Sequence, residues 1–439
     1  MKIQKYIFIL SLLIAVAFTG CTKDIIEPVP TPPYVPLYKV SGLCFSPYND
    51  GQDPNNNSQI SEQQISDLLN KVAPYTNWVR TFGCTDGLEK IPEKAHSLGL
   101  RVAAGAWLSS NLSANQIQIS KLIELGQAGH VDIAIVGSET IARGDLTSLQ
   151  LIGYINQVRT ALPNIPVTTD DVYQTFLVHP EIINAVSIIM ANVYPYWEGI
   201  SIDCAPYFIN TKYESLLAVS QGKEIIIGET GWPSAGNSIG NAVPSDNNAS
   251  RYFLNFVSWA KAKNVRYSYF ESFDEQFKAA TEGPQGAHWG IFNKNGGDLK
   301  PDMKRVFDGE TVPDNWTIDT TVILADSPSV AFTYVPPVGS DSNLKGKAKG
   351  VFPSQYALAI FIYVPGSAWW NKPTFAAPMT YLDCSNNFEC DITTGTNDPG
   401  ATKIRAYLLT VNYNIPLIHG GNLPSSLEQD AVAWIEVVR

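Results

Sequence analysis

The feature that most constrains the fold is a series of apolar, β-branched runs that alternate with helix-like segments between residues 40 and 310. Continuous apolar runs are typical of parallel strands covered on both faces. Between them, Ser61-x-x-Gln64 and Ser113-x-x-Gln116 have the form of capping boxes that begin helices. Eight such units in about 270 residues predict an α/β fold, a (β/α)₈ TIM barrel over residues 38–312. A doubly wound sheet is the alternative, but no glycine-rich phosphate turn follows the first run. The runs are 40–46, 78–82, 101–108, 131–137, 165–169, 187–193, 224–228 and 266–270.

The pattern changes near residue 313. Short strand-like runs follow one another without a convincing helix, and Pro, Gly and Asn punctuate them. This pattern predicts an all-β sandwich over residues 313–439. The predicted strands are 321–325, 330–335, 356–364, 402–411 and 431–438.

The N-terminus has the form of an export signal. Lys2 and Lys5 precede an apolar run over 7–18 that is too short for a comfortable membrane span. The run ends in Phe18-Thr19-Gly20-Cys21, which resembles a bacterial lipobox. The resemblance implies a signal peptide over 1–20, lipidation of Cys21 and a membrane-attached envelope lipoprotein. Thr22 after the cysteine suggests the outer membrane, with the leaflet undecided. The proline-rich residues 21–37 then predict an extended tether.

Composition excludes some classes of partner. The net charge is −11 and the sequence has no basic run beyond the N-terminus, which argues against nucleic acid. The cysteines do not have the spacing of metal ligands, so neither a metal nor another cofactor is expected. In an oxidising compartment Cys384 and Cys390 could close a short loop, whereas Cys44 is expected to be a buried free thiol.

Two carboxylates follow predicted strands, where the catalytic groups of such barrels lie. Glu139 comes directly after the fourth run, and Glu229 comes directly after the seventh. Paired carboxylates facing one pocket can cleave a glycosidic bond, one as proton donor and the other as nucleophile. Aromatic residues follow other runs, including Trp107, Tyr194 and Trp289, and such rings suit the apolar faces of sugars.

Seven short motifs carry a family resemblance. At these motifs the barrel segment resembles glycoside hydrolase family 17, the β-1,3-glucanase family of clan A. The motifs are FSPY at 45–48, WVRTFG at 78–83, GAWL at 105–108, VGSE at 136–139, GETGWPS at 228–234, YFESFDE at 269–275 and HWGIF at 288–292.

The resemblance implies a function and roles for residues. It implies a retaining glycosidase for laminarin-like β-1,3-glucan, with Glu229 as nucleophile and Glu139 as acid/base. Tyr194 is expected to orient Glu229 and to contact substrate. The remaining residues predicted to bind substrate are Tyr48, Arg80, Trp107, Ser138, Tyr196, Trp232, Glu271, Glu275 and Trp289.

The chain departs from the family at Ser138, where the family usually has an asparagine that bonds the sugar 2-hydroxyl. This puts the details of that subsite in doubt, not the reaction class. The mechanism requires Glu139 to start protonated, so its pKa should be raised by burial and by Glu229.

Other functions are consistent with parts of the sequence. A transglycosylase would use the same two glutamates, and a non-catalytic glycan-binding lipoprotein would need neither. In the C-terminal segment, Trp369 and Trp370 lie near Tyr363 and Phe375. We expect these rings to pack in a spacer domain, with a carbohydrate-binding module as the alternative. Because neighbouring strand residues face opposite sides, at most one of the two tryptophans need contact a ligand.

Overall fold

The computed structural model describes residues 34–313, 316, 327–353 and 355–439. The predicted signal peptide, Cys21, most of the tether and the predicted strand at 321–325 lie outside these residues. None of the helices within the described ranges is long and apolar enough to cross a membrane.

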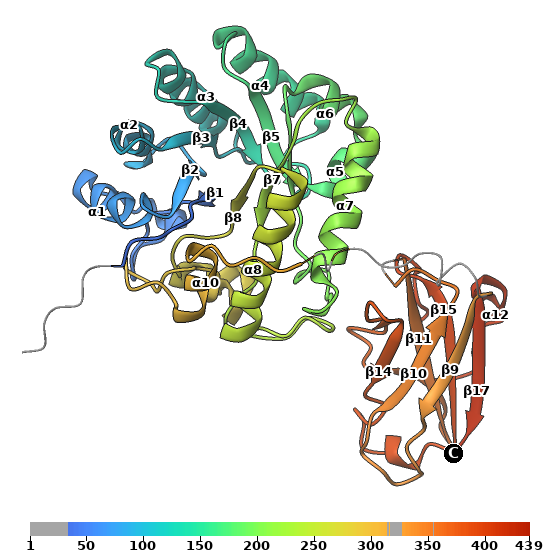
Figure 1. Cartoon of the computed structure of the whole chain (residues 1–439). Coiled ribbons are helices and arrows are strands. Elements are labelled where there is room, and N and C mark those ends of the chain that lie inside the picture. The colour runs from blue at the N-terminus through green and yellow to red at the C-terminus, as the bar shows by residue number, and fades with distance from the viewer. Residues whose placement is uncertain (1–33, 314–315, 317–326, 354) are drawn as a thin grey trace, which may run out of the picture. The chain divides into compact units, whose positions relative to one another are not determined.

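Residues 40–269 form a closed barrel of eight parallel strands, which confirms the predicted fold (Figure 1). Each strand pairs with the next along the chain, and Leu43 of the first strand pairs with Tyr269 of the last to close the barrel. The strands are β1 (Val40–Cys44), β2 (Thr76–Arg80), β3 (Arg101–Ala106), β4 (Ile133–Ser138), β5 (Val167–Val172), β6 (Ile189–Asn192), β7 (Ile225–Thr230) and β8 (Tyr267–Tyr269).

Helices surround the strands in Figure 1. Ser61 caps α1 by accepting from the backbone N–H of Gln64, as predicted. The predicted cap at Ser113 was wrong, because Asn111 caps α3 by accepting from Ala114 and the helix begins at Leu112. The α-helices are α1 (Glu62–Val72), α2 (Ile91–Ser97), α3 (Leu112–Gln127), α4 (Ser148–Ala161), α5 (Tyr173–Val178), α6 (Pro180–Ala185), α7 (Ala205–Val219), α8 (Asp246–Lys263), α9 (Ala279–Glu282) and α10 (Lys304–Phe307). Short 3₁₀ helices lie at Pro54–Asn56, Leu88–Lys90, Gln276–Lys278, Pro284–His288 and Pro301–Met303.

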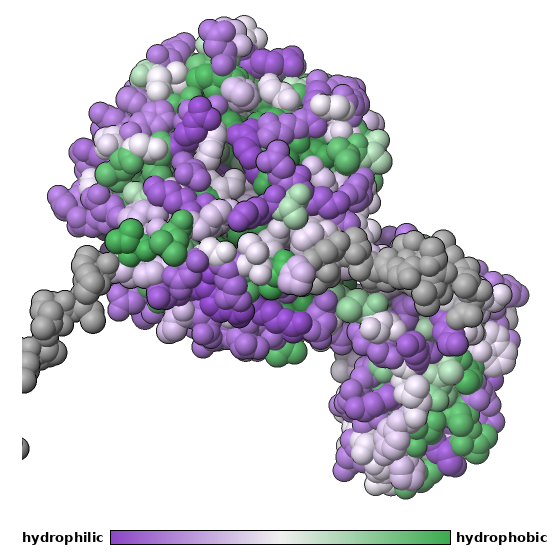
Figure 2. Space-filling model, in the orientation of Figure 1, coloured by the Kyte–Doolittle hydropathy of each residue, from purple (hydrophilic) through white to green (hydrophobic). Residues whose placement is uncertain are grey.

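The strands bury both faces. In β4, Ile133 and Ile135 pack inside the barrel, whereas Ala134 and Val136 pack against the helices. The two-residue alternation of strand side chains produces this division. The inner cluster fills the barrel, and the cleft described below opens beyond the carboxyl ends of the strands. On the face of the barrel drawn in Figure 2, hydrophilic residues predominate.

Residues 329–438 form two antiparallel sheets. Val330 and Leu344 of one sheet and Leu358 and Ile404 of the other share a hydrophobic core, as in a sandwich. The first sheet has the order β14-β10-β9, and the second has the order β16-β12-β11-β15-β17 with β13 paired to β11. The elements are β9 (Ser329–Tyr334), β10 (Leu344–Lys349), β11 (Tyr356–Val364), β12 (Ala368–Lys372), β13 (Thr380–Tyr381), β14 (Asn387–Cys390), β15 (Lys403–Thr410), β16 (His419–Gly421), β17 (Ala433–Val438), helix α12 (Ser426–Asp430) and the 3₁₀ helix Asp398–Gly400.

The sequence predicted only some of these strands. It missed β10, whose residues LKGKAK alternate between buried and exposed but include three lysines. The five cysteines among the described residues are all free thiols, so the loop disulfide considered for Cys384 and Cys390 is not formed. Cys44 is buried, as predicted.

Candidate active site

A cleft of about 420 Å³ opens at the carboxyl ends of the barrel strands. Its volume lies in the ordinary range of small-ligand sites. Glu139 and Glu229 both line it, from the ends of β4 and β7. The other lining residues are Val172, Tyr173, Gln174, Asn192, Tyr194, Trp197, Glu198, Phe270, Glu282 and Trp289.

Glu139 is a largely buried carboxyl group that faces this cleft. It follows β4 in a left-handed conformation with φ of 51°, and its backbone N–H donates to the carbonyl of Asp170 over 2.7 Å. Burial and the negative charge of Glu229 raise its pKa to about 7, although a hydrogen bond from Asn192 lowers it. Glu139 is therefore protonated in a large fraction of molecules near neutral pH, as a proton donor must be.

Glu229 has a different environment. Its Oε2 accepts a hydrogen bond of 2.9 Å from the Tyr194 hydroxyl, and its Oε1 lies 2.7 Å from Nη1 of Arg80. Each of its two oxygens therefore has a partner, one hydroxyl and one guanidinium group. The two glutamates thus face one cleft, one with a proton near neutral pH and the other beside a cation.

Arg80 belongs to a buried polar cluster beneath Glu229. Its Nη2 lies 2.5 Å from Oδ2 of Asp170 and donates to Oγ of Ser138 over 2.8 Å. Burial raises the pKa of Asp170 well above its usual range, although the positive charge of Arg80 lowers it. Gly228 makes room for this cluster, because a Cβ there would lie 2.1 Å from an oxygen of Asp170.

A second buried cluster lies beyond β8. Lys278 forms ion pairs with Glu271 and, over 2.8 Å, with Glu275. Glu275 also accepts hydrogen bonds from the Ser46 hydroxyl (2.7 Å) and the Tyr48 backbone N–H (3.2 Å). Burial raises the pKa of Glu271 well above its usual range, and the charge of Lys278 opposes that shift. The network holds the loop after β8 against the loop after β1.

Aromatic rings form one wall of the cleft. The rings of Tyr194 and Phe270 both pack edge to face on Trp289, with centroids 5.5 and 5.6 Å from it. The indole N–H of Trp289 donates to Glu282 over 2.8 Å, which fixes the ring in place. Trp289 itself is only 1% exposed, so the aromatic surface that the cleft offers to a pyranose face comes from Tyr194 and from Trp197, which is 38% exposed.

The predicted binding residues differ in whether they reach the cleft. Tyr194 and Trp289 line the cleft, and Arg80 and Ser138 lie beneath the two glutamates. Tyr196 and Trp232 are almost fully buried and pack behind the aromatic wall, where their polar atoms bond the backbone of Asn237 and Val243. Trp107 is 43% exposed and stacks under Arg143, outside the residues that line the cleft. Tyr48, Glu271 and Glu275 are buried in the second cluster and do not line the cleft.

Sequence reasoning missed several residues of this site, including two in the strands and two in the loop after β8. Asn192 and Asp170 both lie in the last residues of barrel strands, a signal that the run positions already contained. Lys278 and Glu282 lie in the long loop after β8 and carried no comparable signal.

An eight-stranded barrel with two carboxyl groups in contrasting environments, open to one aromatic-walled cleft, is the architecture of a glycoside hydrolase. Residues 42–290 match the BtgE/BtgC glycoside hydrolase domain, and the chain belongs to this family.

Relatives and solved structures agree with this assignment. The chain is 27% identical over 286 residues to the glucan 1,3-β-glucosidase of Saccharomyces cerevisiae, covering 58% of this chain and 90% of that one. It is 28% identical over 259 residues to the probable β-glucosidase btgE of Aspergillus fumigatus, covering 57% of this chain but only 45% of that one. A glycoside hydrolase family 17 β-1,3-glucanosyltransferase from Rhizomucor miehei is similar in structure, with 30% identity, a TM-score of 0.54, and coverage of 60% and 96%.

Proposed function

We propose that the barrel is a retaining glycosidase that cleaves β-1,3-glucan, with Glu229 as nucleophile and Glu139 as acid/base. The observation that carries this proposal is the contrast between the two glutamates in one cleft. Glu139 has a pKa of about 7, raised by burial and Glu229, while Arg80 and Tyr194 contact both oxygens of Glu229. An ionised nucleophile and a protonated acid are the starting state of double displacement.

The reaction follows from these positions. An oxygen of Glu229 attacks the anomeric carbon while Glu139 gives its proton to the leaving glycosidic oxygen, which leaves a glycosyl ester on Glu229. Glu139 is then a carboxylate, removes a proton from a water molecule, and that water displaces Glu229 from the anomeric carbon. Two inversions retain the β configuration. Asn192 bonds Glu139 and Tyr194 bonds Glu229, so each orients one carboxyl group.

The predicted subsite residues keep their roles in this proposal where they are accessible. Tyr194 is the partly exposed ring that faces the sugar, whereas Trp289 is only 1% exposed and supports Tyr194 through their edge-to-face contact. Ser138 takes the place of the family's asparagine; its hydroxyl oxygen accepts from Arg80, and its own O–H can still donate to the 2-hydroxyl. The loops after β1 and β8 are held together by Tyr48, Glu271 and Glu275. In this proposal these three residues do not contact sugar directly.

The names of the relatives support the substrate class. The yeast relative is called a glucan 1,3-β-glucosidase, and an active-site mutant of the Rhizomucor miehei enzyme has been solved with laminaritriose. That enzyme is called a β-1,3-glucanosyltransferase, which supports transglycosylation as a second candidate. The same covalent intermediate serves both reactions, since a sugar hydroxyl can replace water in the second step.

Incubation with laminari-oligosaccharides tests the proposal. Products shorter than the substrate indicate hydrolysis, whereas longer products indicate transfer, and proton NMR of the first product should show the β anomer. Glu229→Ala should abolish the reaction, and Glu139→Ala should lose most of it but recover partly with azide, which needs no general base. Glu224→Gln is the matched control, because Glu224 is an exposed residue that precedes the same strand. An α product, or full activity in Glu229→Ala, would contradict the mechanism.

We further propose that the chain is anchored through a lipid on Cys21 and lies in the bacterial cell envelope, with the outer membrane as the expected location. The relatives named above are fungal, so this proposal rests on the N-terminal sequence alone. Several acyl chains would give firm attachment. Labelling with radioactive palmitate in a Gram-negative host should mark the chain but not its Cys21→Ala variant. Retention of that variant in the membrane fraction would argue against lipidation.

A further inference from the structure

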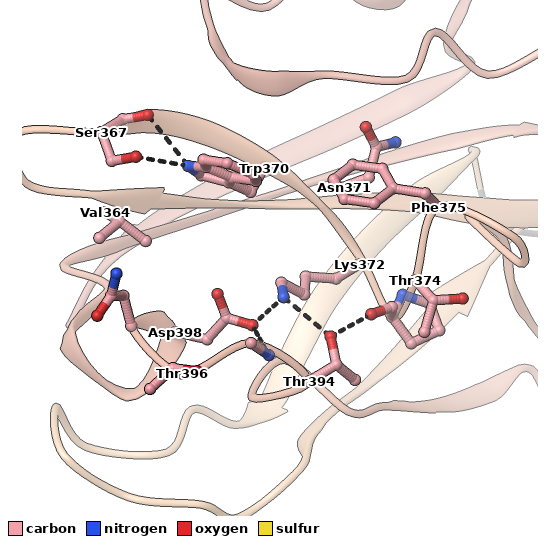
Figure 3. A pocket seen from close by; sticks show the side chains of 13 residues that line it. Val364, Ser367, Trp370, Asn371, Lys372, Thr374, Phe375, Thr394, Thr396 and Asp398 are labelled. Carbon is pink, nitrogen blue, oxygen red and sulfur yellow. Dashed lines mark hydrogen bonds and ion pairs between the residues drawn. The ribbon is translucent and has the colours of Figure 1, made fainter.

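A pocket of about 360 Å³ lies within the C-terminal sandwich, separate from the residues that line the catalytic cleft (Figure 3). Strand β12 and the turn before it form one side, and the loop at 394–398 forms the other. This volume is near the lower end of the range for small-ligand sites. A pocket of this size holds about one to two sugar rings. The lining residues that matter below are Ser367, Trp370, Lys372, Phe375, Thr394 and Asp398.

Two aromatic rings on this pocket are fixed in orientation. The indole N–H of Trp370 donates to the backbone carbonyl and hydroxyl oxygen of Ser367, over 3.0 and 3.2 Å. Phe375 stacks on His419 with centroids 3.8 Å apart, and its ring lies 6.2 Å from that of Trp370. Both rings are partly exposed, so each offers an apolar surface to a ligand. Because their orientations are already fixed, ligand binding costs little side-chain conformational entropy.

Trp369 faces the other side of the same sheet. It packs in a second cluster with Phe361 and Tyr407, whereas Trp370 packs on the core between the sheets. The alternation expected for neighbouring strand residues is therefore confirmed. Only Trp370 of the pair lines the pocket.

The polar part of the pocket is formed by the loop at 394–398 and by the side chain of Lys372, the last residue of β12, and it carries no net charge. Lys372 is buried, with 4% of its surface exposed, yet its ammonium group borders the pocket. It pairs with Asp398, which is also buried, and donates to the Thr394 hydroxyl over 3.0 Å. Thr396 and Asn397 on the same loop are exposed and add a hydroxyl and an amide.

This combination distinguishes between ligand classes. An anionic ligand would have to compete with Asp398 for Lys372, because that cation is already neutralised within the pocket. A purely apolar ligand would remove the Thr396 hydroxyl and the Asn397 amide from water without offering them hydrogen bonds, which is unfavourable. A neutral polyhydroxylated ring suits both sides, with its C–H face on the aromatic rings and its hydroxyls toward the loop.

We propose that this pocket is a carbohydrate-binding site that holds one or two residues of a neutral glucan chain. A site of this kind keeps polysaccharide near the catalytic barrel and raises its local concentration. That the glucan is β-1,3-linked rests on the proposed function of the barrel, whereas the preference for a neutral saccharide rests on the pocket alone.

Affinity electrophoresis of the full chain in gels that contain a soluble polysaccharide tests this site. The background is Glu229→Ala, so that the polymer is not degraded. The polymers are laminarin, mixed-linkage β-1,3/1,4-glucan, hydroxyethylcellulose, soluble starch and the anionic polymer polygalacturonate. Trp370→Ala, Phe375→Ala and the double change of Thr396 and Asn397 to Ala each alter the pocket. Trp434→Ala is the matched control, because Trp434 is 46% exposed on β17 and does not line the pocket.

We expect at least one neutral glucan to retard the chain. The affinity for that glucan should fall roughly tenfold in Trp370→Ala and in Phe375→Ala, and should not change in Trp434→Ala. In the Glu229-containing chain the same changes should leave turnover of laminaritriose within about twofold, since that ligand is short. The exposed Thr396 and Asn397 variant keeps the test informative if Trp370→Ala fails to fold. Pocket-dependent binding of starch alone would support the site and count against the β-1,3-glucan function. Retardation unchanged in every pocket variant, or retardation by polygalacturonate alone, would overturn the proposal.

Discussion

Nη1 of Arg80 lies 2.7 Å from Oε1 of Glu229, and both side chains are buried, with Glu229 lining the cleft and Arg80 beneath it. The contact is an ion pair without the alignment of a hydrogen bond, because Nη1 has no directed partner within the described residues. Arg80 also pairs with Asp170, so one cation offsets two carboxyl groups. Arg80 therefore places a buried positive charge against Glu229, the proposed nucleophile.

Arg80→Met should lower both stability and kcat. Removal of one partner from a buried ion pair leaves an uncompensated charge and costs about 3–5 kcal/mol of unfolding free energy. Addition of Asp170→Asn should restore part of that stability but not the activity, because Glu229 still lacks its cation. Urea unfolding and turnover of laminari-oligosaccharides measure the two effects, with Arg101→Met at an exposed arginine as control. Full activity in Arg80→Met would show that Glu229 does not depend on this cation.

Tyr194→Phe should lower kcat by about 10- to 100-fold, because it removes the 2.9 Å hydrogen bond to Oε2 of Glu229 and keeps the ring. The aromatic contact with Trp289 is retained, so KM should change little. Steady-state kinetics on a single oligosaccharide separate the two parameters. Tyr213→Phe is the control, since Tyr213 packs on Trp259 away from the cleft. A large rise in KM with unchanged kcat would instead indicate that the hydroxyl binds sugar.

The pH profile of kcat/KM should fall on the alkaline side near pH 7. Glu139 must hold a proton for the first step, and burial together with Glu229 raises its pKa to about 7. Asn192 donates to Oε1 of Glu139 over 2.9 Å and thereby favours the ionised form. Asn192→Leu should therefore raise this pKa and move the alkaline limb upward by roughly half to one pH unit. A limb that moves downward, or stays in place, would show that Asn192 does not act through this bond.

The strand pattern predicted the barrel and the placement of the two glutamates, because parallel strands bury both faces and leave a clear apolar signal. It also placed Tyr194 and Trp289, which lie beyond strand ends. Tyr196 and Trp232 had the same signal but do not line the cleft, and Trp289 lines it while only 1% exposed. Sequence position does not tell on which side of a loop a ring lies, and three-dimensional packing decides it.

The C-terminal sheets were harder to predict for a different reason. Strand β10 (Leu344–Lys349) lies between β14 and β9, but two of its three buried residues are Gly346 and Ala348 and lysines fill its exposed positions, so its apolar signal is weak. The tryptophan pair was visible in the sequence, but its division into one pocket residue and one packing residue needed the register of β12. The pairing of Lys372 with Asp398 joins residues 26 apart and had no local sequence signal.

The pKa of Glu139 also predicts a cost in stability. In the folded chain burial and the charge of Glu229 raise this pKa from 4.5 to about 7, so the folded state binds the proton more tightly than the unfolded state. Below pH 4.5 the carboxyl group is protonated in both states and costs nothing. As the pH rises from 4.5 to 7 only the folded state keeps the proton, and stability falls until both states are ionised above pH 7.

Glu139→Gln removes this titration and can still accept from Asn192, so it should be more stable than the parent chain at pH 8 by at most about 3 kcal/mol. The difference should shrink toward zero as the pH is lowered to 4.5, the ordinary value for this carboxyl group. Thermal unfolding of both chains across this pH range measures it, with exposed Glu124→Gln as the control. A stability difference that does not change with pH would mean that Glu139 titrates alike in the folded and unfolded chain, and the raised pKa on which the acid/base role depends would be wrong.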